Sequence, residues 1–209
     1  MRNSITVLGL ALLLACTLTA QERATQMETF LGYTFTRFNS GTNVPAFSAN
    51  GGSGQFVYNI NNWLGGVADF GAVHNGNIHR LQLDSTAATF LFGPRVAFRR
   101  WSRFTPYVQA LFGGVYGTTS VAVPLDVLIV GGEVVIPSGR HLRATAQQTA
   151  FAMTAGGGVD VKVSKHVSVR PVQLEYLMTR LGRFRADNDN TQNNLRYSAG
   201  VNFTFGEGR

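Results

Sequence analysis

The sequence predicts an all-β fold, an eight-stranded antiparallel up-and-down transmembrane β-barrel, and three observations predict it. Eight stretches alternate apolar with polar or small residues at the two-residue period of a β-strand. The connections between these stretches alternate strictly between short and long. Charged residues make up only 14% of the chain, against roughly a quarter in soluble domains, and aromatic residues gather near the predicted strand ends. A length of 209 residues suits one such domain.

The N-terminal segment, "MRNSITVLGLALLLACTLTA", has the plan of a secretory signal. Arg2 precedes an apolar run over residues 5–15, and small residues lead to Ala20. We therefore expect a signal peptide at residues 1–20 and an outer-membrane barrel domain at residues 21–209. Cys16, the only cysteine, lies in "LLAC", which is also similar to a bacterial lipoprotein box, so its lipidation or its removal with the signal both stay open.

The strands follow in chain order from the runs of period two. They are predicted at residues 27–38, 49–60, 63–74, 87–99, 104–117, 149–163, 167–180 and 194–205. Each run reaches the roughly 9–11 residues with which a tilted strand crosses a bilayer. The short connections are predicted to be periplasmic turns, and the long polar connections are predicted to be external loops.

The third long connection contains "SVAVPLDVLIVGGEVVIPSGR". Two apolar runs, residues 125–130 and 133–136, flank Gly131-Gly132, which is a two-residue hairpin signal. A β-hairpin is therefore expected in the third external loop. It could be self-contained, or it could offer a binding edge to another molecule.

The alternating faces raise the question of which face meets the apolar phase. In "TFLFGPRVAF", residues 89–98, Phe90, Phe92 and Phe98 lie on one face and Arg95 lies on the other. A soluble barrel would turn the phenylalanines inward, whereas a membrane barrel turns them outward. Charges of both signs share their face with many glycines, which favours a crowded polar lumen. A soluble lipocalin-like ligand-binding barrel remains the alternative.

Two sets of residues are expected to carry structural roles. The predicted polar network of the lumen consists of Asp69, Arg95, Gln109, Asp160, Lys162, Gln173, Glu175 and Arg196. Arg95 is expected to pair with Asp69, Asp160 or Glu175, because an unpaired buried charge is costly. The predicted interface aromatics are Trp63, Trp101, Phe104 and Tyr107. Eight strands enclose a lumen that side chains fill, so we expect at most a narrow pore.

Several segments together resemble the outer-membrane protein A-like β-barrel family, also described as porin-family or opacity-like barrels. They include "NINNWLGGVADF", "FTPYVQALFGGVYG" and "NNLRYSAGVNFTFG", and the resemblance covers nearly all of residues 27–206. It implies an eight-stranded barrel in the outer membrane of a Gram-negative cell, with outer-membrane lipids and lipopolysaccharide as its surroundings. It also implies the barrel-assembly machinery as a partner, which would read the last strand through Tyr197, Val201, Phe203 and Phe205. The residues "GEGR" follow that signal.

The expected function is a structural role in the envelope, with external loops for interaction and no catalytic, cofactor or metal residues. The ligand of those loops is unknown. His74 and His79 are five residues apart in a predicted loop, where a solvated pair is the ordinary interpretation. An outer-membrane lipid A deacylase is the enzymatic alternative, with His166, Ser168 and Glu175 as its residues. A nucleic-acid partner is not expected: the net charge is +7, but the arginines are dispersed among strands and turns.

Overall fold

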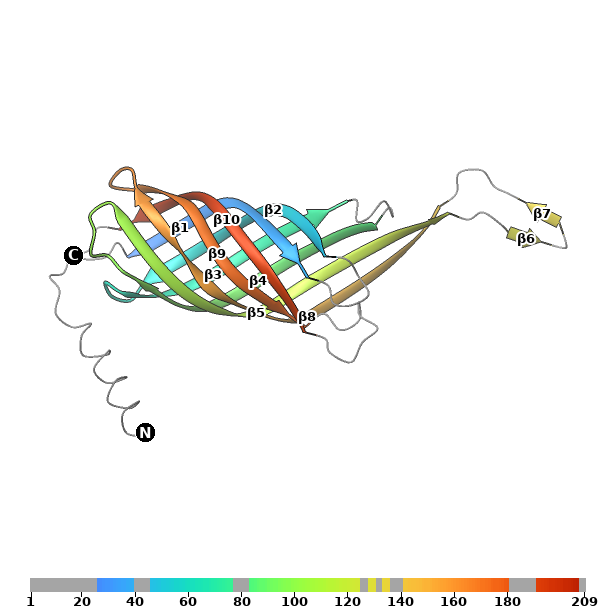
Figure 1. Cartoon of the computed structure of the whole chain (residues 1–209), viewed down its shortest axis with the longest axis horizontal. Coiled ribbons are helices and arrows are strands. Elements are labelled where there is room, and N and C mark those ends of the chain that lie inside the picture. Colours follow the sequence, from blue (N-terminus) through green and yellow to red (C-terminus); the bar gives the residue numbers. More distant parts are fainter. Residues whose placement is uncertain are drawn as a thin grey trace, which may run out of the picture.

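The computed structural model is a closed barrel of eight antiparallel strands (Figure 1). It describes residues 26–39, 46–76, 83–124, 128–130, 133–135, 141–180 and 191–206, so the predicted signal peptide and Cys16 lie outside the described residues. The barrel strands are β1 (Met27–Phe38), β2 (Phe47–Asn59), β3 (Leu64–Asn75), β4 (Leu83–Ala97), β5 (Phe104–Pro124), β8 (His141–Lys162), β9 (Val167–Thr179) and β10 (Gln192–Phe205). Each strand pairs with its neighbours in the chain, and β1 pairs with β10 to close the sheet. The predicted eight-stranded antiparallel barrel is confirmed.

The two ends of the barrel differ in their connections. Three short turns join β2 to β3, β4 to β5 and β8 to β9, and we call this end the short-turn rim. In the first turn the side chain of Asn61 accepts hydrogen bonds from the backbone N–H groups of Trp63 and Leu64, which satisfies donors that the ladder leaves open. The opposite end carries the long connections, and we call it the long-loop rim. Within the described residues, no helix is long and apolar enough to span a membrane.

Strands β5 and β8 are much longer than the sequence predicted. They pair without a break from Phe104↔Val161 to Pro124↔His141, whereas the predicted strands ended at residue 117 and began at residue 149. Figure 1 shows the two strands leaving the barrel side by side as a two-stranded ribbon at the long-loop rim. The sequence missed this extension because Thr and Gln occupy the outward positions there, and apolar alternation was the signal used. Beyond the ribbon, β6 (Leu128–Val130) and β7 (Glu133–Val135) form a separate antiparallel ladder, while Gly131-Gly132 lies outside the described residues.

The barrel turns its large apolar side chains outward. Three side chains are about half exposed: Phe92 on β4, Phe112 on β5 and Leu174 on β9. By contrast, Arg95 on β4 and Glu175 on β9 are buried in the lumen. A soluble barrel would show the opposite arrangement, because its core must be apolar. The lipocalin-like alternative is therefore wrong, since it requires the aromatics inside.

The lumen itself is layered. Leu91, Leu111, Val115, Ala152 and Leu177 form one apolar cluster with Val57 and Val67. The first five lie farther from the short turns than Arg95, Gln109, Asp160 and Gln173 on the same strands. Glycine makes room at one crowded point in the wall: a Cβ atom on Gly93 would lie 2.1 Å from the carbonyl oxygen of Ala110. The ion pairs of Arg95 and Arg170 belong to a polar layer on the short-turn side of this cluster, whereas other polar side chains, such as Thr179 and Asn194, are buried near the long-loop rim.

Candidate functional site: the polar lumen and its mouth

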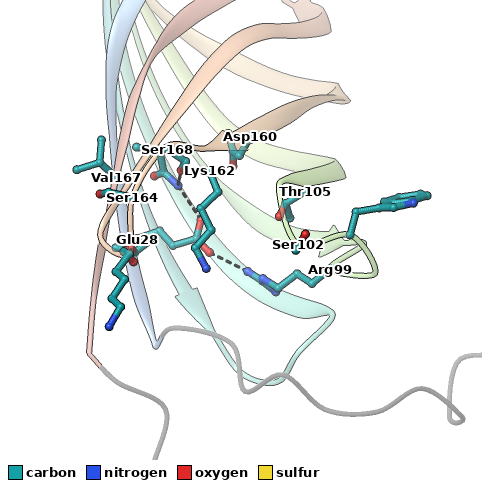
Figure 2. Close-up of a pocket in the computed structure, with 13 residues that line it drawn as sticks. Glu28, Arg99, Ser102, Thr105, Asp160, Lys162, Ser164, Val167 and Ser168 are labelled. Atoms are coloured by element: carbon teal, nitrogen blue, oxygen red, sulfur yellow. Dashed lines mark hydrogen bonds and ion pairs between the residues drawn. The ribbon is translucent and has the colours of Figure 1, made fainter.

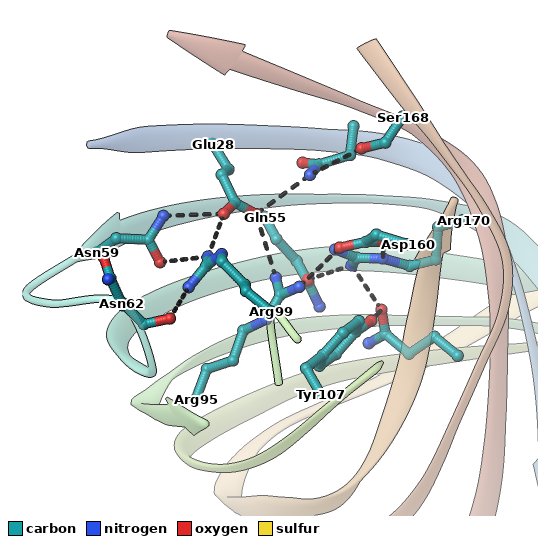
Figure 3. Close-up of polar contacts among 12 residues, drawn as sticks. Glu28, Gln55, Asn59, Asn62, Arg95, Arg99, Tyr107, Asp160, Ser168 and Arg170 are labelled. Carbon is teal, nitrogen blue, oxygen red and sulfur yellow. Dashed lines mark hydrogen bonds and ion pairs between the residues drawn. The ribbon is translucent and has the colours of Figure 1, made fainter. Parts of the chain in front are cut away.

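The buried carboxylate of Asp160 joins two arginines. Arg170 donates from Nε to Oδ1 at 2.6 Å and from Nη2 to Oδ2 at 3.1 Å, and Arg95 donates from Nη2 to Oδ2 at 2.7 Å. Figure 3 shows the three side chains converging from β4, β8 and β9. A bidentate arginine–carboxylate pair fixes orientation as well as charge, so Asp160 holds three strands of the wall in register.

The ring of Tyr107 contacts both arginines. The guanidinium carbon of Arg95 lies 3.5 Å from the centre of the Tyr107 ring, and that of Arg170 lies 4.7 Å from it. The Tyr107 hydroxyl donates to Oε1 of Gln173 at 2.8 Å. The ring face attracts both cations, which offsets part of their mutual repulsion.

The prediction that Tyr107 is an interface aromatic is therefore wrong. Its side chain is only 2% exposed and lies in the lumen, whereas Phe104 is 51% exposed on the outer face. The two residues are three positions apart on β5, and an odd separation in a strand places side chains on opposite faces. The other three predicted interface aromatics are exposed at the short-turn rim: Trp63 and Trp101 lie in turns, and Phe104 is the first residue of β5.

A second ion cluster lies deeper in the lumen. Arg196 donates to both oxygens of Asp69, at 2.8 and 3.1 Å, and from Nε to Oε2 of Glu175 at 2.7 Å. Gln109 donates to the other oxygen of Glu175 at 2.8 Å. Arg196 on β10 thus pairs with two carboxylates, one from β3 and one from β9.

Gln55 connects the two clusters. Its amide nitrogen donates to Oδ2 of Asp69 at 2.7 Å, and its amide oxygen accepts from Nη1 of Arg170 at 2.7 Å. Both halves of the amide are therefore used, and the polar layer is one continuous network across the lumen. In the described part of the chain, its fully buried charges are four carboxylates and three arginines, and the half-buried Arg99 supplies a fourth cation.

The structure brings seven of the eight predicted lumen residues into this network. Lys162 is the exception: its position on β8 has the inward parity, but it is the last residue of the strand and is exposed at the mouth. The predicted pairing of Arg95 is found with Asp160 and, at 3.7 Å, with Glu28. Asp69 and Glu175 pair with Arg196 instead.

Sequence reasoning missed several members of the network, among them Glu28, Gln55, Arg99 and Arg170. Glu28 has inward parity on β1, so its position was available from the alternation. Arg170 was hidden by a β-bulge in β9, where the register shifts against both neighbouring strands. Pro171 was the available signal, because proline within a sheet is confined to edges and bulges.

The lumen opens at the short-turn rim into a pocket of about 120 Å³ (Figure 2). Glu28 stands on its wall and accepts hydrogen bonds from Arg99 at 2.7 Å, from Asn59 at 2.8 Å and from Asn202 at 3.1 Å. Lys162 and Lys165 also line this pocket, together with several hydroxyl side chains. At this mouth the polar layer opens to solvent.

A model of the outer membrane protein beta-barrel domain family matches residues 8–206. The chain belongs to this family. No curated protein matches the chain significantly. As an outer membrane protein β-barrel, it crosses the membrane with its strands, and the exposed aromatic face described above is the face that meets lipid.

Solved structures of outer-membrane barrels share the fold. Neisserial surface protein A superposes with a TM-score of 0.59 at 15% identity, covering 88% of this chain and 100% of that one. The attachment invasion locus protein Ail of Yersinia pestis superposes with a TM-score of 0.52 at 15% identity, over 86% of this chain and 97% of that one. The structure of Ail in complex with the heparin analogue sucrose octasulfate superposes with a TM-score of 0.51 at 14% identity, over 86% of this chain and 97% of that one.

The residues of the enzymatic alternative do not meet in this outer membrane protein β-barrel. His166 is exposed in the turn before β9, while the hydroxyl of Ser168 accepts from Asn202. Glu175 is held deep in the lumen by Arg196 and Gln109. Nucleophile, base and orienting acid must lie within hydrogen-bond reach of one another, and these three do not. His74 bonds to Thr86, His79 lies outside the described residues, and no metal-binding cluster occurs among the residues that the structure describes.

Proposed function

We propose that this chain is a non-enzymatic integral barrel of a Gram-negative outer membrane, with a structural role in the envelope and external loops for interaction. The inverted facing carries the proposal: buried ion pairs fill the lumen, and exposed phenylalanines cover the outside. Such a surface is stable only in lipid or detergent. Outer-membrane lipids and lipopolysaccharide are its surroundings, and no cofactor is required.

The proposed orientation follows from the two rims. The short-turn rim faces the periplasm and the long-loop rim faces outward, as is usual for bacterial barrels with brief and extended connections. Export uses the signal at residues 1–20, and N-terminal sequencing of the mature protein tests that assignment. The barrel-assembly machinery reads Tyr197, Val201, Phe203 and Phe205, which all point to the outer face of β10.

The ribbon of β5 and β8 is the proposed site of interaction. Strand β8 continues well past β9, whose pairing with it ends at Ala152, whereas β4 stays paired with β5 as far as Val121, close to the end of β5 at Pro124. The third-loop hairpin lies at the tip of the ribbon and would be the part of the molecule farthest from the membrane. Ail, one of the similar barrels, is by name an attachment invasion locus protein, which supports a role in surface contact.

The lumen is proposed to conduct ions poorly. Arg95, Tyr107 and Arg170 fill one level, and Leu91 and Leu111 fill the next, so a solute would have to displace both layers. The lumen of an eight-stranded barrel is about wide enough for side chains alone. We expect at most a narrow, transient conductance.

Fractionation of expressed protein tests the proposal. The detergent-extracted outer-membrane fraction is run unheated and heated on a denaturing gel. A membrane-bound species whose mobility shifts on boiling is expected, because a closed barrel resists the detergent until it is heated. A soluble periplasmic protein without that shift would contradict the proposal. Planar-bilayer recording of the same material checks the lumen, and a steady conductance typical of an open porin would contradict the narrow-pore part.

A further inference from the structure

The mouth at the short-turn rim carries a surplus of positive charge. Its described wall and the arginines paired to that wall supply five cations: Arg95, Arg99, Lys162, Lys165 and Arg170. Only two carboxylates, Glu28 and Asp160, stand against them. Charges held in a partly enclosed, low-dielectric mouth are screened less than charges on an open surface, so the surplus attracts anions into the pocket.

Both carboxylates are already committed to the protein. Glu28 receives three hydrogen bonds, two on Oε1 and one on Oε2, and its second oxygen also faces Nη1 of Arg95 at 3.7 Å. Asp160 accepts from Arg170 on one oxygen and from both Arg95 and Arg170 on the other. Neither carboxylate is left to neutralise the two lysines.

Lys162 and Lys165 have no acidic partner in the described part of the chain. Both line the pocket, one from the end of β8 and one from the turn that follows. The hydroxyl groups of Ser102, Thr105 and Ser164 also line the pocket, from two sides of the mouth, and can donate hydrogen bonds (Figure 2). Two ammonium groups with surrounding hydroxyl donors match an anion that has several acceptor oxygens.

The network behind the pocket also has unused donors. Nε and Nη1 of Arg95 are buried without a hydrogen-bond acceptor among the described residues, although Arg95 is 2% exposed. A buried donor without an acceptor is costly, so the charge of Arg95 is incompletely compensated. Arg95 does not line the pocket itself, but it contacts Glu28 and Asp160, which do, and so adds positive charge directly behind the pocket wall.

We propose that this pocket binds a phosphate-type oxyanion, held by Lys162 and Lys165 with the hydroxyl donors of the wall. The proposal goes beyond the structural role of the barrel, because it assigns a ligand to the short-turn rim. Two sources share the chemistry: a soluble phosphate, and the phosphate of a lipid headgroup at the bilayer interface. Trp101, which lines the pocket and is 56% exposed, stands where both could be sensed.

Tryptophan fluorescence of the mature barrel in phosphatidylcholine nanodiscs provides the test. The chain has two tryptophans, so a Trp63→Phe background leaves Trp101 as the reporter. Inorganic phosphate is titrated at constant ionic strength, with chloride as the compensating salt. A saturable change is expected, and the double variant Lys162→Gln/Lys165→Gln should weaken it on the order of tenfold or more, because charge-assisted bonds dominate the site.

A matched control separates the site from general surface charge. Arg100→Gln/Arg103→Gln removes the same charge from exposed positions of the neighbouring turn, which do not line the pocket. This variant should leave phosphate binding nearly unchanged. Equal weakening by both double variants, or a response to phosphate that never saturates, would overturn the proposal. Retention of the heat-dependent gel shift verifies that each variant is folded.

The source of the anion is resolved by changing the lipid. If headgroups occupy the pocket, nanodiscs that contain phosphatidylglycerol should weaken the apparent phosphate affinity, and the lysine variant should abolish that competition. If the ligand is soluble, phosphate binds equally in both lipids and the lysine dependence remains. Absence of lysine-dependent binding in both lipids sinks the proposal for both sources.

Discussion

At the scale of single residues, the two ion clusters of the lumen are not equally well satisfied. Arg196 places its donors on Asp69 and Glu175 with short contacts on each, whereas Arg95 leaves Nε and Nη1 without an acceptor in the described structure. Removal of one partner from a buried ion pair is costly mainly because the other charge is stranded. The deeper cluster should therefore be the more sensitive one.

Replacement of these arginines tests that ranking. Arg196→Leu strands two carboxylates and should lower the free energy of unfolding by about 3–5 kcal/mol or more. Arg95→Leu should cost less, because Asp160 keeps its bidentate bond to Arg170. Urea unfolding in detergent, with the folded fraction monitored by the heat-dependent gel shift, measures the free energy of unfolding of both variants. Arg100→Leu in the exposed turn is the control, and equal stability of all three variants would show that the lumen pairs contribute nothing.

Tyr107 offers a second residue-scale prediction. Tyr107→Phe removes the bond to Gln173 but keeps the ring beside Arg95, and it should cost about 1 kcal/mol. Tyr107→Leu also removes the ring that contacts both arginines and should cost more, by roughly 1–2 kcal/mol. The same unfolding assay compares the two variants. If Tyr107→Leu were no worse than Tyr107→Phe, the cation–ring contacts would be of no energetic importance.

At the scale of strands, alternation of side chains predicted most of what the structure shows. It placed seven of the eight expected polar residues in the lumen network, because inward positions recur every second residue. The prediction failed at Tyr107, because this residue was assigned to the membrane interface from its position near the start of a strand, although its parity along β5 places it in the lumen. It also failed at Arg170, because a bulge changes parity, and at the ribbon, where polar side chains point outward beyond the membrane. The pairing of specific charges could not be predicted, since it depends on the register between strands.

The third-loop segment and the tip of the ribbon are predicted to be dispensable for folding. Deletion of residues 122–138 joins Val121 to Gly139 and leaves residues 139–143 to connect the paired Val121 and Ala144. The closed ladder of the barrel keeps all eight strands, so the heat-dependent gel shift should persist. Loss of that shift would mean that the deleted segment is needed for assembly. A matched internal control is the removal of residues 60–62, which shortens the tight turn between β2 and β3 and should impair folding.

At the scale of the whole molecule, the inverted facing makes the cost of an outward charge depend on its depth in the membrane. Phe92 lies in the middle of β4 and Phe98 lies just past its end, and both are about half exposed. Phe92→Lys should cost about 2–4 kcal/mol and Phe98→Lys about 0–1 kcal/mol, because lysine near the interface can reach water. Unfolding from phospholipid vesicles measures the difference. Equal small costs would place both residues in water and contradict a lipid-facing surface.

The bulge near Pro171 divides β9 into two segments whose inward-facing positions have opposite parity. Before the bulge the even-numbered positions, such as Ser168 and Arg170, face inward. After it the odd-numbered positions, such as Gln173 and Glu175, face inward. Deletion of one residue at the bulge, Pro171 or Val172, would restore regular alternation and leave both halves facing as they do now, because the bulge is one extra residue against each neighbouring strand. A one-residue deletion elsewhere in β9 would instead turn part of the strand inside out. Point substitutions follow a tolerance pattern that changes phase once along the strand.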